Sequence, residues 1–173
     1  MPVSLRKQIV VVASAVALAA GFIGTAEAAP RIVTYNSSNT GEFQAAIDKG
    51  AQIWNSSVVN VQFRKVTGSA NVTVSVDNQW PRAYVSSLGR GRWVMGRQAV
   101  NEGHDTVRIS AHEFGHLLGL PDRRTGLCTD LMSGASAGTS CKNPNPNAKE
   151  KAEVEANFRT LVTVQATTFE DAA

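Results

Sequence analysis

Two histidines one helical turn apart constrain this chain more than any other feature. The segment from His112 to Asp122 reads HEFGHLLGLPD. Side chains at positions i and i+4 of a helix project from one face, so both imidazoles of this segment can reach one Zn²⁺ at about 2.0–2.1 Å. Gly119 can adopt a positive φ and turn the chain back, which lets Asp122 supply a third ligand. The chain must therefore fold so that a helix ends in a tight bend beside a metal.

Glu113 follows the first histidine and points away from the axis that joins the two imidazoles. It can therefore contact a metal-bound water instead of the metal. A catalytic zinc keeps one position open and lowers the pKa of its water from 15.7 to about 7. Glu113 would accept the proton of that water as general base and pass it to the leaving amine. A bare HExxH can be a coincidence on a surface helix, but the glycine exit, the third ligand and an export signal agree here.

The export signal occupies residues 1–28. Arg6 and Lys7 are followed by the apolar run 9–20 and by the small-x-small cleavage site 26–28. A membrane anchor is the alternative, but the apolar stretch is shorter than the about 20 residues that a bilayer needs. No later segment is long and apolar enough to span. We therefore expect a secreted, extracellular protein with no membrane contact after cleavage, and no room for a pro-segment.

The rest of the chain has the composition of one globular domain, expected at 29–160 with a loosely held C-terminal tail at 161–173. The 173 residues are 43% hydrophobic, and the net charge of +3 is too modest to demand a nucleic-acid partner. Period-two and helical patterns predict strands and helices. These elements are a strand at 31–35, a helix at 41–55, a hairpin of strands 59–66 and 71–77, a strand at 89–97, a helix at 106–118, a loop at 121–147 and a helix at 147–158.

The two cysteines, Cys128 and Cys141, are expected to form a disulfide. Export places them in an oxidising compartment, where pairing is the default. Closing a loop of this size stabilises a fold by about 3 kcal/mol on the chain-entropy model. The alternative is a pair of free thiols or metal ligands, but there is no third cysteine and no histidine lies nearby in the sequence.

These motifs together resemble the snapalysins, small secreted neutral metalloproteases of bacteria with a metzincin-like fold. The resemblance rests on HEFGHLLGLPD, on LMSG inside the Cys128–Cys141 loop, on NPNPNA before a helix and on QIWNSSV near residue 52. It implies an α/β (α+β) zinc protease domain. Such a domain has a small, twisted, mostly parallel sheet with an antiparallel edge strand, an active-site helix and a C-terminal helix.

The resemblance also implies the roles of individual residues. His112, His116 and Asp122 would be the zinc ligands, Glu113 the general base, and the disulfide structural. It further implies a preference for an aromatic residue just after the scissile bond. The family carries a structural calcium, for which Asp105 and the carbonyl of Val107 are the candidate ligands. Asp105 is equally an N-cap for the following helix.

Other positions carry further expectations about the site. Met132 would form the Met-turn beneath the metal, although a buried methionine is also ordinary core packing. Arg124 stands where the family typically has a tyrosine, and it can either stabilise an oxyanion or be a solvated loop residue. The substrate would pair as an extended strand with an edge strand at Gly89 to Arg97. Leu117, Leu118 and residues near Met132 would shape an apolar specificity pocket.

Three rival interpretations remain open from the sequence. One is a gluzincin-type peptidase with a third ligand from a later helix, at Glu150, Glu153 or Glu155. The second is an exported binding protein with a vestigial zinc site. The third is a polyanion binder built on scattered arginines, which at this net charge are usually a solvated face. We expect a monomer that acts on protein or peptide substrates and binds no nucleic acid.

Overall fold

The computed structural model describes residues 29–160 and 164–170. The predicted export signal at 1–28 lies outside these residues. Within them the chain forms a six-stranded sheet in the order β2-β1-β3-β5-β4-β6. The strands, in chain order, are β1 (Arg31–Asn36), β2 (Val61–Lys65), β3 (Val72–Asp77), β4 (Arg82–Ser87), β5 (Arg90–Gly96) and β6 (Thr167–Glu170).

The sheet is mixed, with one parallel and one antiparallel part. β1 pairs in parallel with β2 and β3, and β3 pairs in parallel with β5. β4 runs antiparallel to both β5 and β6. The expected α/β class, with a mostly parallel sheet that turns antiparallel toward one edge, is therefore confirmed.

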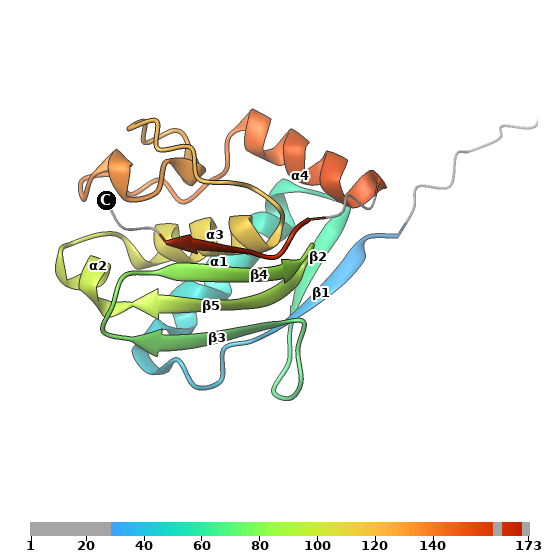
Figure 1. Ribbon diagram of the computed structural model, residues 1–173, viewed down its shortest axis with the longest axis horizontal. Helices are drawn as coiled ribbons and strands as arrows, with labels where there is room; N and C mark the ends of the chain where they lie inside the picture. Colours follow the sequence, from blue (N-terminus) through green and yellow to red (C-terminus); the bar gives the residue numbers. More distant parts are fainter. Residues whose placement is uncertain (1–28, 161–163, 171–173) are drawn as a thin grey trace, which may run out of the picture.

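Helices cover one face of this sheet (Figure 1). α1 (Gln44–Ser57) and α3 (Thr106–Leu117) pack against each other, and Trp54 Nε1 donates a 2.8 Å hydrogen bond to the carbonyl of Ala111. A Cβ on Gly50 would lie 2.8 Å from the Ala111 nitrogen, so the two helices approach closely. The remaining helical segments are η1 (Gly41–Phe43), α2 (Arg97–Asn101), η2 (Leu131–Ala137) and α4 (Ala148–Thr160).

The predicted hairpin between residues 59–66 and 71–77 is wrong. Both segments form strands, but β1 lies between them, because Tyr35 pairs with Lys65 on one side and with Val72 on the other. Residues 66–71 therefore carry the chain across the end of β1 instead of reversing it. Alternation of apolar and polar residues identifies a strand and its buried face, but it does not identify the partner strand.

The predicted edge strand at 89–97 is also wrong in its place. This segment forms β5, which lies inside the sheet between β3 and β4. The strand β4 was not predicted from the sequence, although Ala83 and Val85 are buried while Tyr84 between them is only partly covered. That period-two pattern was a usable signal. β4 and β6 now occupy the edge that was assigned to 89–97.

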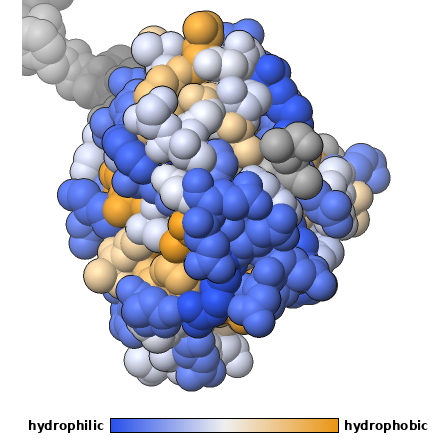
Figure 2. Space-filling view, turned by 90° about the vertical axis from the view of Figure 1, so that its left-hand side faces the viewer, coloured by the Kyte–Doolittle hydropathy of each residue, from blue (hydrophilic) through white to orange (hydrophobic). Residues whose placement is uncertain are grey.

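The molecular surface is predominantly polar on the side shown in Figure 2, with apolar residues in small separate patches. The large hydrophobic side chains that are exposed in the described part are Ile32, Val59 and Leu127, far apart in sequence. None of the helices in the described residues has the length and apolar character needed to cross a bilayer.

Candidate active site

The helix that carries both histidines is capped at each end by its own sequence. The Asp105 side chain accepts hydrogen bonds from the backbone N–H groups of Val107 and Arg108 at 3.0 and 2.9 Å, as an N-cap does. Gly119 ends the helix with φ +91°, a conformation that costs other residues strain. Ten of the twelve residues of α3 are buried. The helix is therefore held rigidly on all sides.

His112 and His116 are each held by a backbone carbonyl. Nδ1 of His112 lies 3.0 Å from the carbonyl oxygen of Leu131, and Nδ1 of His116 lies 2.8 Å from that of Leu120. A carbonyl only accepts, so each Nδ1 carries the proton. The Nε2 atom of each ring is then left with a lone pair, which is the state that binds a metal.

The three predicted ligands converge in the structure. Nε2 of His112 lies 3.0 Å from Nε2 of His116, and Asp122 Oδ1 lies 3.2 and 3.6 Å from the same two nitrogens. Two lone pairs and a carboxylate oxygen at these separations repel one another unless a cation lies between them. Ligands at about 2.0–2.1 Å around a tetrahedral zinc are about 3.3 Å apart. The residues present therefore fit a zinc ion.

The protonation states suit the same ion. Burial lowers the pKa of His116 to about 3, with a further lowering by His112, so this ring is neutral at physiological pH. Burial alone would raise the pKa of Asp122, but its contacts with His112, His116 and Arg124 lower it on balance. Two neutral imidazoles and a carboxylate are the forms that zinc requires.

Glu113 is completely buried, one residue from His112. A carboxyl group is seldom fully buried without a specific role or partner. Because it follows His112 in the chain, it lies next to the candidate metal ligands. It is not itself a member of the converging group, which consists of His112, His116 and Asp122.

Met132 lies directly beneath the zinc helix. A Cβ built on Gly115 would approach its sulfur to 2.7 Å, so the absence of a side chain at that position makes room for it. The backbone N–H of Met132 donates a 2.8 Å hydrogen bond to Oε1 of buried Glu150 on α4. Cys128 and Cys141 are joined in a disulfide that brackets this segment. The expected disulfide is present, whereas the role of Met132 as a Met-turn stays a prediction.

The three carboxylates considered as rival third ligands have other partners. Glu155 accepts hydrogen bonds from the backbone N–H groups of Val59 and Asn60, and Glu153 pairs with Arg123. In the described residues, the one group of three or more His, Cys, Asp and Glu that could hold a metal is the set with Asp122.

Two further expectations concern this region. Leu117 and Leu118 were expected to shape an apolar specificity pocket together with residues near Met132, but both leucines are completely buried in the core, so that part of the prediction is wrong. The calcium site gains no support, because the Asp105 side chain caps α3 and the N–H of Val107 donates to it. A narrow cavity of about 10 Å³ does lie between α3 and η2, lined by His112, Gly134 and Ala135.

Arg124 lies at the rim of the site. Its guanidinium is 3.6 Å from Oδ2 of Asp122, and it donates a 2.7 Å hydrogen bond to the carbonyl oxygen of Glu170 in β6. Arg124 adopts a positive φ of 46°, which is uncommon for a residue with a side chain. The Arg124 side chain thus lies between Asp122 and β6.

One further group at the site, Phe169, was not predicted from the sequence. Its ring stacks on the imidazole of His116 with centroids 4.1 Å apart and planes within 5°. Phe169 comes from the segment expected to be a loose tail, where Thr167–Glu170 instead forms β6. The alternation of Thr168, Phe169 and Glu170 was too short to be distinguished from a polar terminus.

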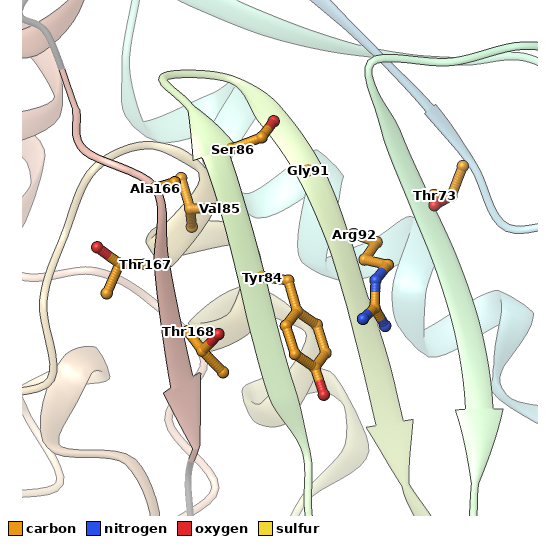
Figure 3. Close-up of a pocket in the computed structure, with 9 residues that line it drawn as sticks. All are labelled: Thr73, Tyr84, Val85, Ser86, Gly91, Arg92, Ala166, Thr167 and Thr168. Atoms are coloured by element: carbon orange, nitrogen blue, oxygen red, sulfur yellow. The ribbon is translucent and has the colours of Figure 1, made fainter.

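A larger hollow lies on the opposite, open face of the sheet and does not include the metal ligands. Figure 3 shows Tyr84, Arg92 and Thr73 projecting into this hollow of about 470 Å³ from β4, β5 and β3. The Arg92 guanidinium lies 3.6 Å from the centre of the Tyr84 ring, a cation–π contact that occupies part of it. The chemistry predicted from the sequence belongs to the helix-covered face.

Comparison with known proteins places the chain in a family. The family model of the Streptomyces extracellular neutral proteinase (M7) matches residues 31–159. The chain is 46% identical over 125 residues to an extracellular small neutral protease of Streptomyces caespitosus, which covers 72% of this chain and 94% of that protein.

Two longer relatives give the same result. Extracellular small neutral proteases of Streptomyces lividans and Streptomyces sp. (strain C5) are 40% and 41% identical over 128 and 123 residues. These matches cover 73% and 70% of this chain but 56% and 54% of the relatives, so the chain spans about half their length. The resemblance seen in the zinc-site string is confirmed, and the chain belongs to the Streptomyces extracellular neutral proteinase (M7) family.

Proposed function

We propose that this chain is a secreted zinc metalloendopeptidase in which His112, His116 and Asp122 hold the ion and Glu113 is the general base. The observation that carries the proposal is the convergence of two Nε2 atoms and one carboxylate oxygen within 3.0 to 3.6 Å. The relatives are named neutral proteases, and the buried Glu113 next to the ligands supplies the acid–base group that peptide hydrolysis needs.

The chain's own residues divide the work of hydrolysis. A bound zinc ion supplies an acidified water and polarises the carbonyl of the scissile bond. Glu113 accepts a proton from the attacking water and delivers it to the nitrogen of the leaving amine. The carbonyl oxygens of Leu131 and Leu120 keep the imidazoles in the ligating tautomer. Arg124, near the outer oxygen of Asp122, balances negative charge that develops on the substrate.

The substrate is proposed to lie extended along β4. In the sheet, β4 lies between β5 and the C-terminal strand β6, so its outer edge is open to a peptide only where β6 leaves it. Extended peptides add to such an edge through backbone hydrogen bonds. The proposed preference for an aromatic residue after the scissile bond rests on the family resemblance. The stacking of Phe169 on His116 supports this preference, because it shows that an aromatic ring fits at the site.

Export is part of the same proposal. Residues 1–28 would be removed as a signal and the domain at 29–160 would act outside the cell, in agreement with the extracellular relatives. We propose a monomer. Amino-terminal sequencing of the secreted protein should find a start at Ala29, and a retained residue 1 would contradict the signal.

The decisive experiment replaces Glu113 with Gln. The substitution keeps size and burial but removes the base, so kcat for an internally quenched peptide should fall by about 10²–10⁴-fold while one zinc per chain is retained. Glu102→Gln, at an exposed glutamate at the end of α2, is the matched control and should leave kcat unchanged. Chelation should abolish the wild-type activity and added Zn²⁺ should restore it. Undiminished hydrolysis by Glu113→Gln would reject the assignment of the base.

A further inference from the structure

The edge of the sheet at β4 is covered by a segment of the chain itself. β6 pairs antiparallel with β4, with Arg82 opposite Glu170, Ala83 opposite Phe169 and Val85 opposite Thr167. Figure 3 shows Ala166 to Thr168 running beside Tyr84 and Val85. In Figure 1 the same strand passes across α3, the helix that carries the histidines. The segment thus lies where an extended substrate would lie.

The side chains of β6 divide between the two faces of the sheet. Phe169 is opposite Ala83, which is buried on the helix side, and its ring stacks on His116. Thr168 is opposite Tyr84 and lines the hollow on the open face. Thr167, Thr168 and Glu170 are exposed, and Phe169 is only partly buried. A single aromatic side chain therefore anchors the segment, and it does so on a proposed zinc ligand.

Arg124 provides a second link between the segment and the site. Its guanidinium donates to the backbone carbonyl of Glu170 while lying 3.6 Å from Asp122 Oδ2. A hydrogen bond to a backbone carbonyl does not depend on the side chain of that residue. The Arg124 guanidinium can therefore bind the carbonyl of any peptide at this position.

We infer that residues 167–170 are a built-in peptide ligand of the β4 edge, which competes with substrate for that edge and for the face of His116. The inference rests on the proposed function in that it assigns the substrate to β4. One edge of a strand can pair with one partner at a time, so the tail must leave before another peptide can bind. The family match ends at residue 159, before this segment begins.

Displacing the tail should change substrate affinity and leave the chemical step intact. A site that is open for only a fraction of the time shows an apparent affinity reduced by that fraction. Phe169→Ala removes a buried aromatic contact, so KM should fall by about two- to tenfold with kcat unchanged. Thr168→Ala, on the same strand but facing away from α3, is the matched control and should leave KM within error of the wild type.

Hydrogen exchange provides a readout that does not depend on catalysis. In the zinc-loaded full chain, Phe169→Ala should increase deuterium uptake in the peptide that contains residues 82–87, because the β4 backbone loses its partner, whereas Thr168→Ala should not. The hexapeptide Gln-Ala-Thr-Thr-Phe-Glu, which copies residues 165–170, should inhibit the Phe169→Ala variant competitively. The same peptide with alanine in place of phenylalanine should inhibit more weakly.

The outcomes separate this inference from the proposed function. A wild-type chain that cleaves no peptide would reject the proposed function, while hydrogen exchange would still decide whether the tail protects β4. Peptide cleavage together with an unchanged or raised KM and unchanged exchange in Phe169→Ala would overturn the tail as a competing ligand and leave the peptidase assignment standing.

Discussion

The metal side and the strand side of this site are built in different ways. The metal side consists of His112, His116 and Asp122, which lie within eleven consecutive residues. The two histidines are buried, and Asp122 is largely buried beside them. The strand side consists of β4 and β6, whose paired residues are 82 to 88 positions apart and are mostly exposed along β6. One side is built from neighbouring residues of one helix and its exit, and the other joins segments distant in sequence and is largely exposed along β6.

Because of this difference, we expect the two sides to differ in how well they tolerate amino-acid substitutions. Backbone carbonyls hold both imidazoles, and Met132 packs against the helix at Gly115, so displacement of one candidate ligand should disturb the others. The β6 strand contributes backbone pairing and one aromatic ring, so its loss should leave the rest of the fold in place. Substitutions on the metal side should therefore lower metal binding, activity or stability more than substitutions on the strand side do.

The largest effect beyond the loss of Glu113 is expected for Asp122→Ala. Removing one of three ligands should weaken zinc binding by more than the about 10–100-fold that loss of an outer-shell partner costs. Metal content after dialysis, measured by atomic absorption, should fall well below one per chain. His104→Ala, a histidine that packs edge-on against Trp80 and is not part of the converging group, is the control. Retention of stoichiometric zinc in Asp122→Ala would place the third ligand elsewhere.

The next largest effect concerns the disulfide that brackets the Met132 segment. Replacing Cys128 and Cys141 together by serine should lower the free energy of unfolding by about 3 kcal/mol, because the unfolded chain regains the entropy of an open loop. Urea unfolding of the double variant, compared with that of the disulfide-bonded wild type, measures this loss of stability. A loss below about 1 kcal/mol would mean that the loop is held by its other contacts.

A single methyl group at Gly115 tests how tightly Met132 supports the helix. The added Cβ of Gly115→Ala would meet the Met132 sulfur at 2.7 Å and Cζ2 of Trp54 at 3.3 Å. Overpacking of this kind costs about 1–3 kcal/mol. Gly68→Ala, where a Cβ has no neighbour within 4 Å, is the control and should be close to neutral by thermal unfolding. Equal stability of the two variants would show that the core beneath the histidines yields freely.

The smallest effect is expected on the strand side, at the ion pair that ties the end of β3 to the start of β4. Asp77→Asn should cost less than about 1 kcal/mol, because the pair is partly exposed. The hydrogen bonds from Arg82 hold the pKa of Asp77 below its ordinary value, so this contribution is present at neutral pH and is lost as the pH falls through the acid range. Unfolding at pH 7 and at pH 3 should show the difference between the two proteins shrinking. A difference that grows at pH 3 would contradict this.

The sequence predicted the elements better than their arrangement. The helices around residues 41–55, 106–118 and 147–158 were predicted close to their observed bounds, because amphipathic spacing and caps such as Asp105 act within one or two turns. The strands β1, β2, β3 and β5 were also predicted, β2 and β3 of them from alternation. The pairing was not, because β1 separates β2 from β3 and β5 is interior, and these choices depend on residues distant in sequence.

The spacing from His112 to Asp122 was enough to predict which three side chains converge, because a helix and the bend after it bring two imidazoles and a carboxylate together. What lies opposite that group depends on contacts between segments that are distant in sequence. Phe169 reaches His116 because β6 pairs with β4, and four residues near the end of the chain carry no local pattern that names a partner strand. The geometry of one helix and its exit fixes the three converging side chains. The pairing of β6 with the edge of β4 depends instead on backbone hydrogen bonds between distant segments, and side-chain identity specifies such pairing only weakly.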